Sequence, residues 1–140
     1  RNRRLSDRLT VVTGQSHAVL EASDAVLVAS GTAALEAALY KKPMVVGYAM
    51  PALSALIMKD KGLIPYVSLP NILAGRAIVP EFLHYYCTAD AMACSLIEQL
   101  KDSRRKTLAE IFTAMHESLL RPTADLASEA IMQTAGAARR

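Results

Sequence analysis

The chain has 140 residues, a net charge of +3 and a sequence with 52% hydrophobic and 21% charged residues. Its length allows one compact domain or half of a two-domain architecture. The composition excludes a disordered, collagen-like or low-complexity protein. With no tryptophan and 5% aromatic residues, the core must consist mainly of aliphatic side chains and methionine, which favours helices packed on strands. The charge excess, much of it at the two ends, is compatible with contact to phosphates or an anionic membrane but requires neither.

The first elements alternate between strand and helix. Residues 9–13 form a β-branched apolar run that ends at Gly14 and predicts a strand. Ser16 can then cap a helix that continues to about residue 22. The continuous apolar run at residues 25–29 is typical of a strand buried on both faces in a parallel sheet.

A second helix and a third strand complete the alternation. Residues 33–39 are strong helix formers, closed by Lys41, Lys42 and Pro43, and residues 44–47 predict the next strand. Successive strands joined by helices imply right-handed crossovers and a parallel sheet. The predicted fold class is therefore α/β, a Rossmann-like parallel sheet with helices on both faces.

The remainder of the chain is predicted to contain helices and one long loop. Pro51 fits the first turn of a helix that runs to about residue 61 and stops at Gly62. A loop with little periodicity follows and carries Pro65, Pro70 and Gly75. The last third is predicted to be helical, without strands, over residues 88–101, 106–120 and 123–135.

The cysteines and the apolar runs indicate where in the cell the chain is expected. Cys87 and Cys94 are expected on one helix, about 10 Å apart along its axis, which is too far for a disulfide. We therefore expect reduced thiols in the cytoplasm. The longest apolar stretch, residues 44–58, contains Pro51 and falls short of the roughly 20 residues of a membrane-spanning helix. The charged first residues precede no signal-peptide core, and the chain begins without methionine, as expected of a fragment.

The junction between the second strand and its helix is a candidate ligand site. Ser30, Gly31 and Thr32 follow the buried strand directly. In an open parallel sheet, ligands bind at the carboxyl ends of the strands, where a helix start presents free N–H groups suited to a phosphate. Gly31 permits close approach of the backbone, and the two hydroxyls can cap the helix or bind a phosphate oxygen. Neither a P-loop nor a dinucleotide fingerprint is present.

Glu36 lies one turn into this helix and is a candidate for a sugar. The residue three positions before it is Ala33, so Glu36 cannot complete a capping box. Its carboxylate could accept hydrogen bonds from the two hydroxyls of a ribose. The alternative is a surface glutamate stabilised by the helix N-terminus.

The long loop contains a second pair of candidates. Asn71 can donate and accept hydrogen bonds, and Arg76 can bind a phosphate or carboxylate with its guanidinium group. The alternative assigns Asn71 to a turn or cap and Arg76 to solvent. The three histidines and two cysteines show no metal-ligand spacing, and no nucleophile motif occurs, so we expect no metal and no catalytic nucleophile.

Three blocks of the sequence resemble the C-terminal half of lipid-A-disaccharide synthase. They cover residues 26–36, 42–48 and 65–76 and occur in the order and spacing of that family. The resemblance extends from about residue 9 to residue 100. It implies a GT-B glycosyltransferase of bacterial lipid A biosynthesis. Such an enzyme transfers 2,3-diacylglucosamine from its UDP derivative to 2,3-diacylglucosamine 1-phosphate, forming the disaccharide and UDP.

The resemblance also implies roles for the candidate residues. Ser30, Gly31 and Thr32 would face the diphosphate, Glu36 the ribose, and Asn71 with Arg76 the diphosphate or the sugar. No metal or cofactor is implied. No catalytic residue maps to this chain, because the acceptor-binding half and its catalytic acid lie upstream in the family. Ala49 stands where many members carry a basic residue.

Partners and domain organisation follow from the same resemblance. Residues 1–105 would form the donor-nucleotide-binding domain, and residues 106–140 would pack on an N-terminal half or on a second chain as a homodimer. The acylated substrates imply transient contact with the anionic inner membrane from the cytoplasmic side. No nucleic acid partner is expected. A UDP-sugar-binding module without transferase activity, and another GT-B or epimerase-type enzyme, are the alternatives.

Overall fold

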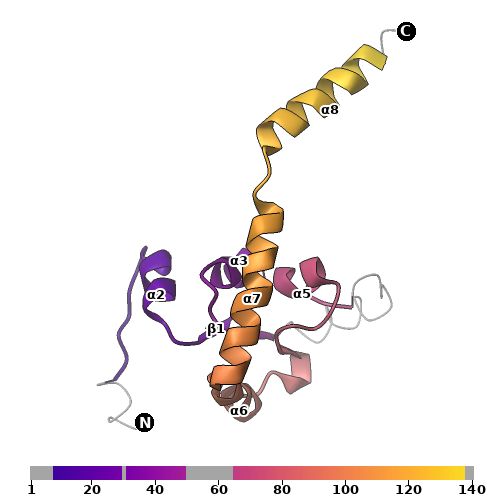
Figure 1. Cartoon of the computed structure of the whole chain (residues 1–140). Coiled ribbons are helices and arrows are strands. Elements are labelled where there is room, and N and C mark those ends of the chain that lie inside the picture. Colours follow the sequence, from indigo (N-terminus) through magenta and orange to yellow (C-terminus); the bar gives the residue numbers. More distant parts are fainter. Residues whose placement is uncertain (1–7, 30, 50–64, 138–140) are drawn as a thin grey trace.

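A computed structural model describes residues 8–29, 31–49 and 65–137 of the chain (Figure 1). The elements in order are α2 (Ser16–Ala22), β1 (Val26–Val28), α3 (Thr32–Leu39), β2 (Met44–Tyr48), α5 (Leu69–Ala74), β3 (Glu81–Leu83), the 3-10 helix η1 (His84–Tyr86), α6 (Ala89–Gln99), α7 (Asp102–Leu119) and α8 (Thr123–Ala137). The predicted α/β class is confirmed. The helix predicted over residues 51–61 lies outside the described residues.

The sheet has three parallel strands in the order β1-β2-β3. Val28 pairs with Val46, which in turn pairs with Glu81 on the other side. The strands predicted near residues 25–29 and 44–47 are confirmed, as are their parallel pairing and the helix between them. The carboxyl ends of all three strands therefore meet at one edge of the sheet.

The two faces of the sheet are covered by different helices. Met44 and Val46 belong to the same core cluster as α3 and α7 side chains, whereas Gly47 lies against α6, where an added Cβ would be 2.6 Å from the Met92 sulfur. Side chains alternate between faces along a strand. Helices therefore cover both faces, as the fold prediction requires.

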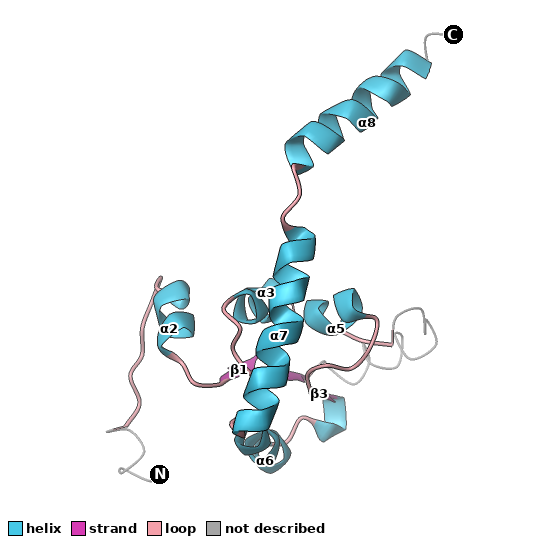
Figure 2. Cartoon of the chain, in the orientation of Figure 1, coloured by secondary structure: helices cyan, strands magenta, loops and turns pink. Residues whose placement is uncertain are grey.

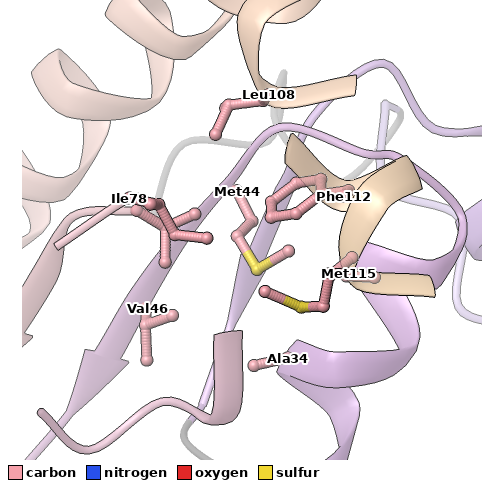
Figure 3. Packing of buried hydrophobic residues seen from close by; sticks show 10 residues of the cluster. Ala34, Met44, Val46, Ile78, Leu108, Phe112 and Met115 are labelled. Atoms are coloured by element: carbon pink, nitrogen blue, oxygen red, sulfur yellow. The ribbon is translucent and has the colours of Figure 1, made fainter. Parts of the chain in front are cut away.

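The core lies between the sheet and the α3–α7 pair (Figure 3). Alanines on the inner face of α3 allow α7 to approach closely, and larger α7 side chains fill the space above β2. The labelled members of this cluster are Ala34, Met44, Val46, Ile78, Leu108, Phe112 and Met115. The boundary expected between residues 105 and 106 falls inside α7, and the three α7 side chains complete this core.

The N-terminal prediction was wrong in two details. Residues 9–13 do not form a strand, and Leu9 and Val11 are 72% and 81% exposed. A β-branched run becomes a strand only where a neighbouring strand supplies hydrogen bonds and side-chain contacts, and no described residue does so here. The cap of α2 is Gln15 rather than Ser16, which is the first helical residue.

Three elements were absent from the prediction, α5, β3 and the 3-10 helix η1, and all lie in the region expected to be a loop. The cysteines also differ from expectation: Cys87 precedes α6 and only Cys94 lies on it. Both cysteines are free, as predicted. The three C-terminal helices are confirmed, with Thr88 capping α6 through its side chain.

The last helix projects away from the rest of the molecule (Figure 2). It follows a short connection after α7, and its side chains from Thr123 to Thr134 are exposed. Within the described ranges, no helix combines the length and apolar character that crossing a membrane requires.

Candidate functional site

The carboxyl edge of the sheet is where the predicted site residues begin to assemble. The chain leaves β1 through residue 29 and enters α3 at Thr32, and it leaves β3 directly into His84. Since β1 and β3 flank β2, these two exits are two strand spacings apart across the sheet, about 10 Å. This edge of a parallel sheet is the usual location of a ligand.

Gly31 provides the backbone turn into α3. Its φ of 117° lies in the region that favours glycine, and an added Cβ would meet nothing within 4 Å. Conformation rather than space therefore requires the glycine. Among the described residues no side chain caps α3, and Thr32 is exposed at its start, so the helix presents amide groups and a hydroxyl outward. Ser30 lies outside the described residues.

Glu36 lies one turn beyond Thr32, on the same side of α3. Its side chain is 41% exposed, and its carboxylate is 4.0 Å from His17 Nε2 on α2. The His17 side chain is 70% exposed and lies near the Tyr40 ring, with the ring centroids 5.8 Å apart. A long contact between exposed groups contributes little to stability, so the Glu36 carboxylate remains accessible to hydroxyl donors.

Asn71 is buried, with 1% of its surface exposed, and its amide is used within the chain. Nδ2 donates to the Val79 carbonyl oxygen at 2.9 Å and to Glu81 Oε1 at 2.8 Å. Oδ1 accepts from the Ile78 and Val79 amides at 2.8 Å and 3.0 Å. These four bonds match the amide's full capacity, and they hold α5 against the segment that leads into β3.

Glu81 belongs to the same network, although its sequence context did not predict a role in the site. Oε1 accepts from the Ser68 amide at 2.9 Å and from the Ser68 hydroxyl at 2.6 Å, in addition to Asn71. Oε2 accepts from the Val67 amide at 3.0 Å. One carboxylate thus fixes the turn before α5 to β3. The available signal was an acidic residue within the apolar run 78–83.

Arg76 does not join Asn71 in the structure. It follows Gly75, whose φ of 63° ends α5, and it is exposed. Within the described part of the chain its guanidinium group forms no ion pair. The predicted residues therefore fall into an accessible group on α3 (Gly31, Thr32 and Glu36), a buried anchor (Asn71) and an exposed cation (Arg76). Among residues 8–29, 31–49 and 65–137, no cluster of three potential metal ligands occurs.

Comparison with known proteins gives a consistent result. The family model described as "Lipid-A-disaccharide synthetase" matches residues 2–135. The chain is similar to the lipid-A-disaccharide synthase of Burkholderia lata, with 52% identity over 126 residues, covering 89% of this chain and 32% of that protein. It is 54% identical over 126 residues to the synthase of Cupriavidus pinatubonensis, covering 89% of this chain and 31% of that protein.

The synthase of Paraburkholderia xenovorans is similar to the same degree, with 52% identity over 124 residues, 88% of this chain and 32% of that protein. The chain thus spans about a third of the length of the curated relatives it matches. The family match covers nearly the whole chain and agrees with the α/β structure. The chain belongs to the lipid-A-disaccharide synthase family.

Proposed function

We propose that this chain is the donor-nucleotide-binding part of a glycosyltransferase of lipid A biosynthesis. The full reaction transfers 2,3-diacylglucosamine from its UDP derivative to 2,3-diacylglucosamine 1-phosphate and releases UDP. The observation that carries the proposal is the start of α3. There Gly31 turns the chain from β1 into α3, whose start no described side chain caps, and the accessible Glu36 carboxylate follows one turn later.

The α3 residues would act on the diphosphate and the ribose. The first amides of α3 and the Thr32 and Ser30 hydroxyls would donate hydrogen bonds to phosphate oxygens, which the helix N-terminus also favours electrostatically. Glu36 would accept hydrogen bonds from the ribose hydroxyls. As the bond between the donor sugar and UDP breaks, negative charge grows on the leaving diphosphate, and the same donors would stabilise it.

Asn71 and Arg76 complete the proposed site in different ways. The Asn71 amide is saturated by internal bonds, so it would serve the site by holding the loop and β3 in position. Arg76 is exposed and has no ion-pair partner in the described ranges, so its guanidinium group is free to bind a phosphate. We assign no catalytic residue to this chain.

The partners of the whole enzyme are part of the proposal. The acceptor sugar and the catalytic acid would be supplied by an N-terminal half. The acylated substrates require transient contact with the cytoplasmic side of the inner membrane, which the net positive charge favours. Exposed apolar side chains on α8, among them Leu126 and Ile131, are available for contact with that half or with a second copy in a homodimer.

Calorimetric titration of UDP tests the donor site. We expect the chain to bind UDP in preference to ADP, and Glu36→Ala to weaken binding by about 1–3 kcal/mol because hydrogen bonds to a charged group are lost. Glu98→Ala is the matched control, since Glu98 is a surface glutamate on α6, away from α3, and pairs with Lys101. The chain alone is expected to bind UDP weakly and to form no disaccharide.

Two results would contradict this proposal. If neither the folded chain nor the longest natural protein that contains it binds UDP, the start of α3 is not a nucleotide site. If the chain alone forms disaccharide, the assignment of the catalytic machinery to another part of the enzyme is wrong.

A further inference from the structure

His84 has the position and the backbone geometry of a binding residue, although its sequence context gave it no role. It follows β3 directly, so it lies at the carboxyl edge of the sheet together with the start of α3. Its φ of 51° lies in the left-handed region, which only a few per cent of residues other than glycine adopt. Such backbone conformations are concentrated at functional sites.

The two nitrogens of the His84 ring have different surroundings. Nδ1 is buried and has no hydrogen-bond partner among the described residues. The side chain as a whole is only partly buried. Leaving a buried N–H unpaired is less tolerated than leaving a buried lone pair unpaired. The tautomer that leaves a lone pair rather than an N–H group on the buried Nδ1 is the one with its proton on Nε2.

We propose that the Nε2–H group of His84 donates a hydrogen bond to an oxygen of the diphosphate-sugar portion of the bound donor. This inference rests on the proposed donor site. Glu36 would hold the ribose beside β1, and His84 lies two strands away from Gly31, about 10 Å across the strand ends. A nucleotide sugar extending across this edge would bring to His84 the portion that is remote from the ribose.

The test measures calorimetric affinity for UDP and for UDP-N-acetylglucosamine in the longest natural protein that contains this chain. His84→Gly removes the ring and relieves the left-handed backbone, so we expect an unchanged or higher melting temperature with binding about three- to tenfold weaker. A purely structural role would not combine these two changes. His84→Gln places an amide nitrogen near the position of Nε2 and should restore binding.

His84→Asn distinguishes the role of Nε2 from that of Nδ1, because its shorter amide lies near the position of Nδ1. Asparagine also tolerates the backbone conformation. We expect it to be stable and to bind as weakly as His84→Gly. Weaker binding of both ligands would assign the contact to the diphosphate, and weaker binding of UDP-N-acetylglucosamine alone would assign it to the hexose. Tyr85→Ala is the control, since Tyr85 is adjacent and 86% exposed.

The outcomes separate this inference from the proposed function. If all His84 variants bind both ligands as the parent does while Glu36→Ala binds more weakly, the role of His84 is wrong and the donor site stands. If the parent protein binds neither ligand, the donor site and the role of His84 are both wrong.

Discussion

Glu81 shows how a single carboxylate can organise a loop that carries candidate site residues. It accepts hydrogen bonds from two backbone amides, one hydroxyl and one side-chain amide, all from residues 67–71. These bonds tie the turn before α5 to the third strand, next to the edge where the ligand is proposed to bind. The loop conformation therefore depends on β3, which is distant from it in sequence.

Replacing Glu81 should loosen this loop. Glu81→Gln would set an amide group against donors that now face a carboxylate, and we expect the free energy of unfolding to fall by about 1–3 kcal/mol in urea denaturation. Hydrogen exchange at the Val67 and Ser68 amides should accelerate more than exchange in β2. Glu98→Gln changes an exposed glutamate whose partner is the exposed Lys101, and it should lower the free energy of unfolding by less than about 0.5 kcal/mol. Equal effects of the two substitutions would contradict the anchoring role.

Long-range contacts of this kind limit what the sequence could predict about single residues. The prediction grouped Gly31, Thr32 and Glu36 because a strand, a glycine and a helix start are adjacent in sequence. The structure has Gly31 as the N-cap of α3 and the other two residues within its first turns. Asn71 and Arg76 were predicted to act together on the diphosphate or the sugar, with a turn residue and a solvated cation as the alternative. Their difference in burial arises from the position of residues 78–81, which local patterns do not specify.

At the scale of elements, α7 completes the core that α3 and the sheet begin. Phe112 and Leu108 are fully buried against α3 alanines and Met44. Phe112→Ala should therefore reduce the free energy of unfolding by about 3–5 kcal/mol, and Phe112→Leu should reduce it less. Leu120→Ala is the control, because Leu120 is 70% exposed. Similar losses for Phe112→Ala and Leu120→Ala in urea denaturation would show that α7 is not docked on the core.

The elements that the sequence predicted are those with long, regular patterns. The helices α3, α6, α7 and α8 and the two apolar strands β1 and β2 were found from periodicity, composition and caps. The β3 strand has three residues, follows a proline and contains a glutamate, so its apolar pattern is too short to detect. Conversely, residues 9–13 have strand propensity but no described neighbour to pair with, and propensity alone does not make a strand.

At the scale of the whole molecule, the rest of the chain should stay folded when α8 is removed. The α8 side chains from Thr123 to Ala135 are exposed, including Leu126, Ile131 and Met132 at 49%, 67% and 73%, whereas α7 supplies three members of the core. Removing residues 122–140 should change the free energy of unfolding by less than about 0.5 kcal/mol. It should also reduce self-association in light scattering, because exposed apolar surface is lost.

A second truncation, which ends at residue 101 and removes α7 as well, should abolish cooperative unfolding. The first truncation keeps α7 and the second removes it, so the comparison shows whether α7 or α8 completes the core. The α3 alanines and Met44 are covered by α7 residues Leu108, Phe112 and Met115, so only the loss of α7 exposes the core. If the shorter deletion destabilised the chain as much as the longer one, α8 would be packed on the core in solution. Its exposed apolar side chains would then be unavailable for an N-terminal half or a second copy.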